Sequence, residues 1–412
     1  MNQPAVTVIG GGVIGLATAY QIALDGTKVT LVDSGEPRFG TSNQNAGWVA
    51  PSHVIPFAAP GMVSMGVEQL LKRTGAFGFS PTAGPLLASW TMKFMRSCTE
   101  EHVNNSVPAL TELLNNSIAG FEKLIANEGL KRAPEALWYI FSSDKAAEHA
   151  HHEVELMTRY GIGVREIDIN EARTKEPILK DTAKAVVEFD ADFGIDPKST
   201  VEILTRLCIQ NGVTIRTDET VARVAATRND VSIATNKDSW TSEYLVIAAG
   251  VWSRELAKSL GANLPIMPAK GHSITIPGLA NQPMRPFLLA EQRIAGNALD
   301  WGLRLSTGYT LTSPKDRNVD MKAVSKLVDT ASKVLDIPNS TVNVNPWTGL
   351  RPSSPDGLPY IGPLSNAPRV IMATGHGMLG TMMAMGTAVL VADQIAGRST
   401  SRETLKFSPS RP

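Results

Sequence analysis

The chain has little of several features that would point to particular classes of protein. It has two cysteines in 412 residues, Cys98 and Cys208, too few for a disulfide framework or a cysteine metal site and consistent with a reducing compartment. It has no excess of charge of either sign, because 39 Lys and Arg balance 39 Asp and Glu, so we expect no nucleic-acid partner. No basic segment with an apolar core precedes the first strand, so we expect no signal peptide.

Long uncharged apolar runs are also missing. The nearest, residues 378–397, contains Asp393 and several glycines, and this pattern favours a buried helix over a membrane span. We therefore expect a cytoplasmic protein, with peripheral contact at the inner face of the cytoplasmic membrane left open. Hydrophobic residues make up 43% of the chain, enough for large cores, and the length favours two domains.

The N-terminus carries a dinucleotide-binding pattern. An apolar strand at 6–9 leads to Gly10, Gly12 and Gly15, then to a helix-length segment and a second strand that ends at Asp33. In such a βαβ unit the glycines allow a tight turn, the approach of a pyrophosphate and close packing of helix on strand. The helix N-terminus attracts phosphates, and the acid accepts bonds from a ribose hydroxyl. The acid disfavours NADP but does not separate NAD from FAD.

The rest of the chain predicts an α/β protein with a discontinuous nucleotide-binding domain. Residues 34–61 are rich in Gly, Pro, Ser and Asn and predict a long irregular segment, and residues 315–335 predict a helix. We expect a Rossmann-like domain with a parallel sheet, and an inserted α+β substrate domain with an antiparallel sheet. The first is assigned to 1–50, 195–260 and 345–412, and the second to 51–194 and 261–344.

Further segments resemble one family of flavoenzymes. In chain order they read TSNQNAG at 41–47, AAGVWS at 248–253, PAKGHSIT at 268–275, WTGLRPSSPDGLP at 347–359 and TGHGMLG at 374–380. Together they resemble the D-amino-acid oxidase and glycine oxidase superfamily, and most closely its bacterial D-amino-acid dehydrogenases. The resemblance implies an FAD-dependent oxidoreductase with a Rossmann fold. An NAD-dependent dehydrogenase would leave the later motifs unexplained, and a non-catalytic nucleotide-binding subunit would require a blocked pocket or the lack of an arginine equivalent to Arg351, neither of which is visible in the sequence.

The resemblance also implies a reaction. A D-amino acid would be oxidatively deaminated by hydride transfer from Cα to flavin N5, and the electrons would pass to a quinone or another carrier. Some relatives work within multi-subunit complexes, so partner subunits stay open. Dehydrogenation of D-proline or cis-4-hydroxy-D-proline to a cyclic imine stays open as an alternative, and so does an oxygen-using amino-acid oxidase. Trp48 replaces a polar residue expected from the closest resemblance, which leaves the breadth of substrate specificity open.

The resemblance assigns cofactor contacts to all three segments of the nucleotide-binding domain. They are Gly10, Gly12, Val13, Ile14, Gly15, Asp33, Ser34, Thr41, Ser42, Asn45, Ala46, Gly47, Val221, Ala249, Gly250, Trp252, Arg351, Gly375, His376, Gly377, Met378, Leu379 and Gly380. A helix opening at 375–380 would direct its positive end at the flavin. Some relatives attach the flavin through a cysteine near the arginine loop, but residues 340–360 contain none, so we expect non-covalent FAD.

Arg351 is the candidate for holding the substrate, because a guanidinium matches a planar carboxylate in a bidentate fork. His53, His272, Tyr309 and Tyr360 are further pocket candidates, each also explicable as a packing or turn residue. No catalytic acid or base is required if the amine enters neutral, because the protein then acts by orientation and desolvation. No metal is expected: the histidine-rich segment 148–153 lacks the spacing of a metal site.

Overall fold

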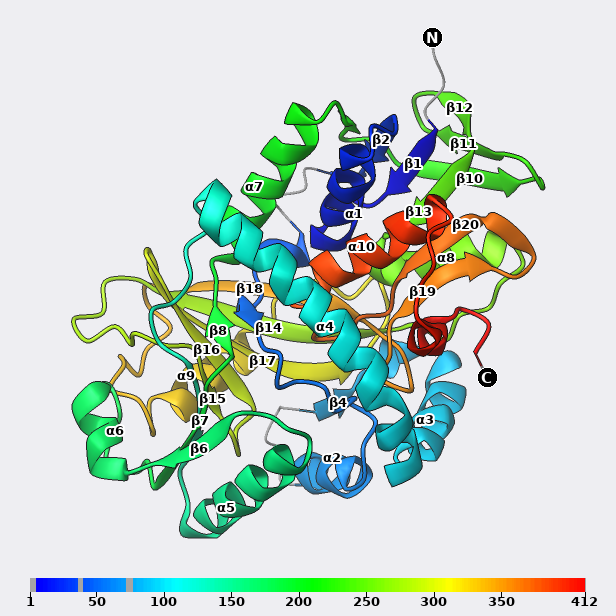
Figure 1. Ribbon diagram of the computed structural model, residues 1–412. Helices are drawn as coiled ribbons and strands as arrows, with labels where there is room; N and C mark the ends of the chain where they lie inside the picture. The colour runs from blue at the N-terminus through cyan, green and yellow to red at the C-terminus, as the bar shows by residue number, and fades with distance from the viewer. Residues whose placement is uncertain (1–4, 36–39, 72–76, 412) are drawn as a thin grey trace.

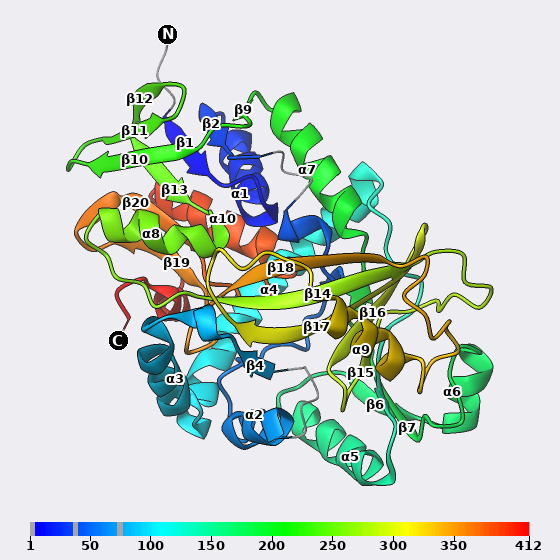
Figure 2. The ribbon, with the colours of Figure 1, turned by 180° about the vertical axis from the view of Figure 1, so that it is seen from behind.

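The computed structural model describes residues 5–35, 40–71 and 77–411. Its core is two large sheets, each assembled from segments far apart in the sequence (Figures 1 and 2). Among the described helices, none has the length and apolar content that a membrane crossing requires.

The first sheet is the Rossmann-like sheet that the sequence predicts. Within the described residues it has six strands in the order β19-β20-β13-β1-β2-β9, all parallel except β19. Its central strands are buried apolar runs, as expected of a parallel sheet covered on both faces. The strands are β1 (Val6–Ile9), β2 (Val29–Val32), β9 (Thr214–Arg216), β13 (Tyr244–Ile247), β19 (Tyr360–Leu364) and β20 (Ala367–Thr374).

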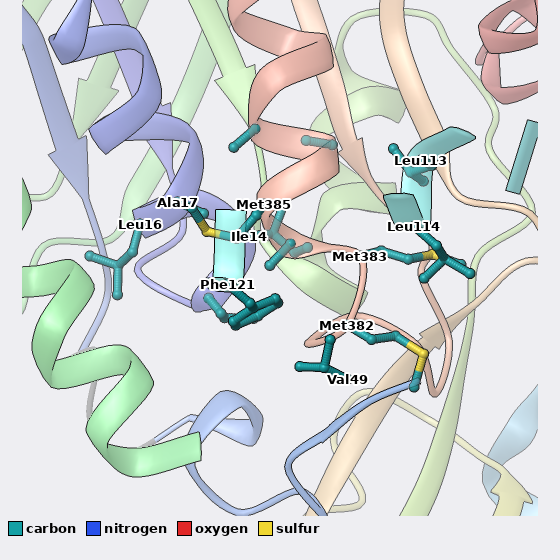
Figure 3. Close-up of a cluster of buried hydrophobic side chains, with 14 of the residues drawn as sticks. Ile14, Leu16, Ala17, Val49, Leu113, Leu114, Phe121, Met382, Met383 and Met385 are labelled. Carbon is teal, nitrogen blue, oxygen red and sulfur yellow. The ribbon is translucent and has the colours of Figure 1, made fainter. Parts of the chain in front are cut away.

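Helices cover one face of this sheet and a small antiparallel sheet covers the other. The helices are α1 (Val13–Leu24), α4 (Glu100–Glu128), α7 (Pro197–Gln210) and α10 (Ala384–Ile395); the small sheet comprises β10 (Val221–Ala226), β11 (Val231–Thr235) and β12 (Ser239–Ser242), with α8 (Ser253–Ser259) beside it. α1 and α10 are apolar nearly all round because neighbours enclose them. Figure 3 shows their contact, where Ile14 and Ala17 of α1 lie near Met385 of α10 and Phe121 of α4.

The second large sheet is mixed but mainly antiparallel. Its strands are β18 (Asn345–Ser353), β14 (Met267–Ile276), β17 (Gly302–Leu311), β16 (Ile294–Leu299), β15 (Phe287–Leu289), β5 (Leu137–Phe141), β7 (Ala185–Phe189) and β6 (Val164–Ile167), with β4 (Phe77–Phe79) on β17. One face packs on α9 (Met321–Ala331) and α6 (Ile169–Lys175), and the other faces the Rossmann-like part. The remaining helices are α2 (Met62–Leu71), α3 (Leu86–Ser97) and α5 (Asp144–Arg159), and a short ribbon joins β3 (Trp48–Val49) to β8 (Phe193–Gly194).

Three elements differ from the sequence predictions. β18 lies within the segment 345–412 assigned to the nucleotide-binding domain, yet it pairs along its whole length with β14 of the second sheet. The helix predicted at 315–335 begins only at Met321, because the Asp320 side chain accepts bonds from the N–H groups of Lys322 and Ala323 and so caps it there. The last helix, α10, begins at Ala384 rather than within 375–380, since Gly375 and Gly377 adopt positive φ.

Candidate functional site

A cavity of about 940 Å³ lies at the carboxyl ends of the parallel strands, where open α/β sheets bind ligands. Its volume is near the upper end of the roughly 300–1,000 Å³ of ligand pockets. Most of the predicted cofactor residues line it: Gly10, Gly12, Val13, Ile14, Asp33, Ser34, Thr41, Ser42, Asn45, Val221, Ala249, Gly250, Trp252, Arg351, His376, Gly377, Met378 and Gly380. Gly15, Ala46, Gly47, Gly375 and Leu379 are not among the lining residues.

The glycine turn at one wall of the cavity has the geometry of a phosphate cradle. Gly10 has φ +111°, and a Cβ there would lie 2.4 Å from the carbonyl oxygen of Ala248; a Cβ on Gly15 would lie 1.8 Å from the carbonyl oxygen of Gly10. Only glycine fits such approaches, so α1 can pack against β1 with its N-terminus facing the cavity. The Ser42 hydroxyl accepts a hydrogen bond from the Val13 N–H at 2.9 Å, which joins the 41–47 segment to this helix end.

Asp33 ends β2 and faces the same cavity. Its carboxylate accepts hydrogen bonds from the backbone N–H groups of Gly11 at 2.5 Å and Gly35 at 2.8 Å. These bonds fix a negative charge beside the glycine turn, where a nucleotide ribose would meet it. The turn, the open helix end and the acid therefore fit the sugar and diphosphate of a dinucleotide.

Arg351 enters the cavity wall from β18. Its Nη1 donates to the carbonyl oxygen of Gly308 at 2.6 Å, and a Cβ on Gly271 of β14 would lie 2.0 Å from that nitrogen. Gly308 has φ +89° and lies in a bulge of β17 opposite β14; bulges commonly re-aim groups near functional sites. Burial lowers the pKa of Arg351, and no described carboxylate lies within ion-pair distance of it. The remaining guanidinium donors are therefore available to an anion.

The other pocket candidates are not among the residues that line the cavity. Tyr309 shares the face of Arg351, but its hydroxyl bonds to the Ser353 hydroxyl and its ring packs 4.7 Å from Phe57; burial raises its pKa to about 12. His272 follows Gly271 on β14 and so points to the opposite face of the sheet, where burial lowers its pKa. Tyr360 lies under the Arg411 guanidinium, at 3.8 Å from the ring centroid.

His53 belongs to a buried polar cluster beside the β3–β8 ribbon. Its Nδ1 lies 3.2 Å from the Ser52 hydroxyl and its Nε2 lies 3.3 Å from the Tyr139 hydroxyl. Asp192 accepts bonds from the backbone N–H and the hydroxyl of Ser52. Burial lowers the pKa of His53 to about 4 and raises the pKa of Asp192 to about 7. His53 is therefore neutral near pH 7, and the cluster lies apart from the cavity lining.

His376 is the one histidine among the described lining residues. Its Nε2 lies 3.0 Å from the Thr387 hydroxyl of α10, and burial lowers its pKa to about 3. The imidazole is therefore neutral at physiological pH and serves to fix the turn before α10. In the described part of the chain, no group of three His, Cys, Asp or Glu side chains is placed to hold a metal ion.

Two arginines near the cavity were not predicted from the sequence. Arg317 lines the cavity near Trp252, with its guanidinium 5.6 Å from the ring centroid. The sequence prediction of a helix from 315 places Arg317 in that helix and not in a loop. Pro314 and the capping acid Asp320 are signals that the helix begins later. Arg304 lies beneath residues 41–47 and donates to backbone carbonyls. Every residue has a backbone carbonyl, so the sequence does not indicate which carbonyls this arginine contacts.

The cavity, the two large sheets and the half-buried Arg351 together define a dinucleotide-binding protein with a second large sheet beside the cavity. A family model described as DAO, FAD dependent oxidoreductase, matches residues 5–394. The chain belongs to this family of FAD-dependent oxidoreductases. This confirms the predicted family, fold class and cofactor.

Named relatives and solved structures are similar to this chain over nearly its full length. A "D-amino acid dehydrogenase" of Neisseria meningitidis is 28% identical over 98% of this chain and 99% of its own, and a "D-amino acid dehydrogenase 1" of Mesorhizobium japonicum is 30% identical over 95% and 96%. Glycine oxidase from Geobacillus kaustophilus has a similar fold, with a TM-score of 0.79 at 21% identity over 100% of both chains. L-proline dehydrogenase from P. horikoshii has a TM-score of 0.77 at 16% identity over 99% and 97%.

Proposed function

We propose that the protein is an FAD-dependent dehydrogenase that oxidatively deaminates D-amino acids. The observation that carries the proposal is Arg351, a half-buried arginine in the cavity wall without a described carboxylate partner. Such a group is costly unless an anion pairs with it, and the α-carboxylate of an amino acid is a planar anion of matching shape. The names of the full-length relatives support the D-amino acid as substrate.

FAD fits the cavity with its diphosphate at the Gly10–Gly15 turn and a ribose at Asp33. The lining residues predicted above would hold it, with the backbone of Val221 near the adenine and the turn at Gly377–Met378 near the flavin ring. When bound, FAD supplies an acceptor for the hydride of the substrate's Cα–H bond, and so for the two electrons that the substrate loses. All described lining residues except Arg317 come from the three segments assigned to the nucleotide-binding domain, which supports that division of the chain apart from β18.

The chain's own contribution is to bind and orient the substrate. Arg351 grips the carboxylate, while the bond from its Nη1 to Gly308 prevents the guanidinium from swinging. The His376 imidazole is hydrogen-bonded to Thr387 and burial lowers its pKa to about 3, so it is too weak a base to take a proton from the amine. The amine therefore enters without its extra proton, and the imine product hydrolyses in water, or persists if it is cyclic.

FAD is held without a covalent bond to the protein. Cys208 is buried, its thiol donates to the carbonyl oxygen of Leu16, and burial raises its pKa to about 12. Cys98 ends α3, and neither cysteine lines the cavity. Acid precipitation is expected to release the yellow colour into solution, and colour retained in the pellet would contradict this.

The side chain of the substrate and the electron acceptor are the finer parts of the proposal. Trp48 is buried and donates to the carbonyl oxygen of Gly296 on β16, so an aromatic ring stands where the closest resemblance expects a polar group. This favours testing cyclic substrates, D-proline and cis-4-hydroxy-D-proline, beside acyclic ones. We assign the electrons to a quinone or another carrier because the named relatives are dehydrogenases.

Anaerobic bleaching of the bound flavin tests the proposal directly. D-alanine, D-proline, cis-4-hydroxy-D-proline and their L-enantiomers are added singly, and we expect bleaching near 450 nm by D-enantiomers. Bleaching by L-enantiomers alone, or by none of the panel, would overturn the assignment. Reoxidation by a soluble quinone analogue but not by oxygen is expected of a dehydrogenase, whereas stoichiometric peroxide would identify an oxidase.

A further inference from the structure

Arg304 is a buried cation of the substrate-side sheet that has no ion-pair partner among the described residues and that the proposed reaction does not use. Its side chain lies on β17 and only 2% of the residue is exposed. Its Nε donates to the Thr275 hydroxyl at 2.9 Å, and its Nη1 donates to the carbonyl oxygens of Asn43 at 3.4 Å and Asn45 at 3.3 Å. Within the described chain, no carboxylate lies within ion-pair distance of it.

The two carbonyls that Arg304 holds belong to the 41–47 segment. This segment contributes Thr41, Ser42 and Asn45 to the cavity lining, and the Ser42 hydroxyl accepts the N–H of Val13 at the start of α1. Arg304 thus reaches from the substrate-side sheet to the underside of a wall of the cofactor cavity. Its guanidinium also stacks over Trp301, with the ring centroid at 4.9 Å.

We propose that Arg304 is a positioning residue for FAD, which fixes the 41–47 segment in its binding conformation and leaves a buried positive charge for the anionic cofactor to offset. A cation removed from water is costly when its hydrogen-bond partners are neutral; those of Arg304 are a hydroxyl and two carbonyls, and the Asp196 carboxylate acts on it only from beyond ion-pair distance. Burial accordingly lowers the pKa of Arg304 to about 10. A bound diphosphate would offset that cost, so the arginine favours the loaded state. This inference rests on the proposed placement of FAD in the cavity.

A purely structural buried arginine has a different setting in the same sheet. Arg285, with 3% of the residue exposed, contacts Glu176 at 2.8 Å, Glu188 at 3.2 Å and Glu135 at 3.3 Å. Its charge is balanced by side chains of the protein itself. We expect replacement of Arg285 to affect folding, so Arg285 provides the matched control for Arg304.

The test measures the FAD dissociation constant of the apoprotein by quenching of flavin fluorescence. R304M removes the charge and all three hydrogen bonds, and we expect FAD to bind about 10- to 100-fold more weakly. R304K keeps the charge but loses the fork, so a smaller loss is expected. T275V removes only the Nε acceptor, and we expect about a threefold loss. The thermal midpoint of R304M apoprotein should lie within a few degrees of wild type, because a costly buried charge is gone.

The controls separate the two proposals. G12E places a negative charge in the glycine turn and should abolish FAD binding; if it binds FAD as wild type does, the placement of FAD in the cavity is wrong. R285M should lower the thermal midpoint of the apoprotein while the folded protein keeps wild-type FAD affinity. If G12E loses FAD but R304M and R304K bind it as tightly as wild type, the role of Arg304 is overturned. If R304M does not fold, R304K and T275V decide the question by the same criterion.

Discussion

The two faces of the substrate-side sheet hold buried or half-buried cations in contrasting settings. On the face toward the cavity, Arg351 and Arg304 donate to backbone carbonyls and hydroxyls, with no described carboxylate in ion-pair distance. On the other face, Arg285 binds three glutamates and Lys270 binds Asp316 at 2.6 Å. Basic side chains of one sheet therefore differ in their partners: those on the face toward the cavity have no described carboxylate in ion-pair distance, and those on the other face are paired with carboxylates.

We infer that this difference distinguishes charges that would bind ligands from charges that stabilise the fold. In a buried ion pair each charge is compensated by the other. Removing one partner leaves the other charge uncompensated in a medium of low dielectric constant. A buried cation without a pair lowers the stability of the empty protein and favours any anion that enters. The comparison therefore predicts that the two kinds of arginine fail differently when replaced, one in binding and the other in folding.

Arg351 should give the largest functional effect. In R351M the substrate carboxylate loses a bidentate charged contact, and we expect kcat/KM to fall about a thousandfold or more. R351K keeps the charge but not the fork, so its loss should be smaller. Steady-state kinetics with the best D-amino acid measure both, and the flavin absorbance checks that FAD stays bound. An unchanged KM in R351M would remove the substrate role.

Arg285 should give the largest effect on stability. R285M leaves Glu176 buried without its cation and leaves Glu188 with only the more exposed Arg165, and we expect the free energy of unfolding to fall by about 3–5 kcal/mol. Urea unfolding measures the loss, and the KM of the folded enzyme should stay at the wild-type value. Adding E176Q to R285M should recover part of the stability. A large change in KM with no change in stability would break the comparison.

The sequence predicts those parts of the site that geometry forces on the chain. The spacing of Gly10, Gly12 and Gly15 is visible because a tight turn and a close helix–strand approach admit no side chain. Arg351 could be placed at the cavity from the sequence because it lies inside a distinctive motif. By contrast, Arg304 contacts backbone carbonyls, which every residue possesses, so the sequence does not reveal these contacts. The face of the sheet on which His272 lies depends on the register of the strands, which long-range pairing sets.

The domain boundaries show the same limit. A single nine-residue strand, β18, carries Arg351 from the chain segment of the cofactor domain into the substrate-side sheet. Its partner β14 lies about 80 residues earlier, and such long-range pairing is a tertiary choice that local pattern does not encode. Arg317 was hidden for a local reason, since the helix begins six residues after the predicted start and the freed loop reaches the cavity.

Asp192 sharpens the comparison with a buried carboxylate that has no arginine. Burial raises its pKa from 3.8 to about 7, so the folded state favours the protonated acid. Its stabilising contribution is complete below about pH 4 and is lost as the pH rises through 7. D192N should therefore leave stability unchanged near pH 4 and increase it by about 2–4 kcal/mol at pH 8. Urea unfolding across this range measures it, and a D192N difference independent of pH would contradict the prediction.

Gly271 offers the smallest and most local test. A methyl group there would meet the Arg351 guanidinium, since the added Cβ would lie 2.0 Å from Nη1. In G271A the arginine must move away from the Gly308 carbonyl, and we expect KM to rise about tenfold with FAD affinity unchanged, as a displaced charged contact costs about 1–2 kcal/mol. G66A is the matched control, because a Cβ at Gly66 meets nothing within 4 Å, the backbone there has no positive φ and the residue lies outside the cavity lining. Equal KM values for G271A and wild type would mean that the guanidinium binds substrate from another position, and the bulge at Gly308 would then lose its role in aiming it.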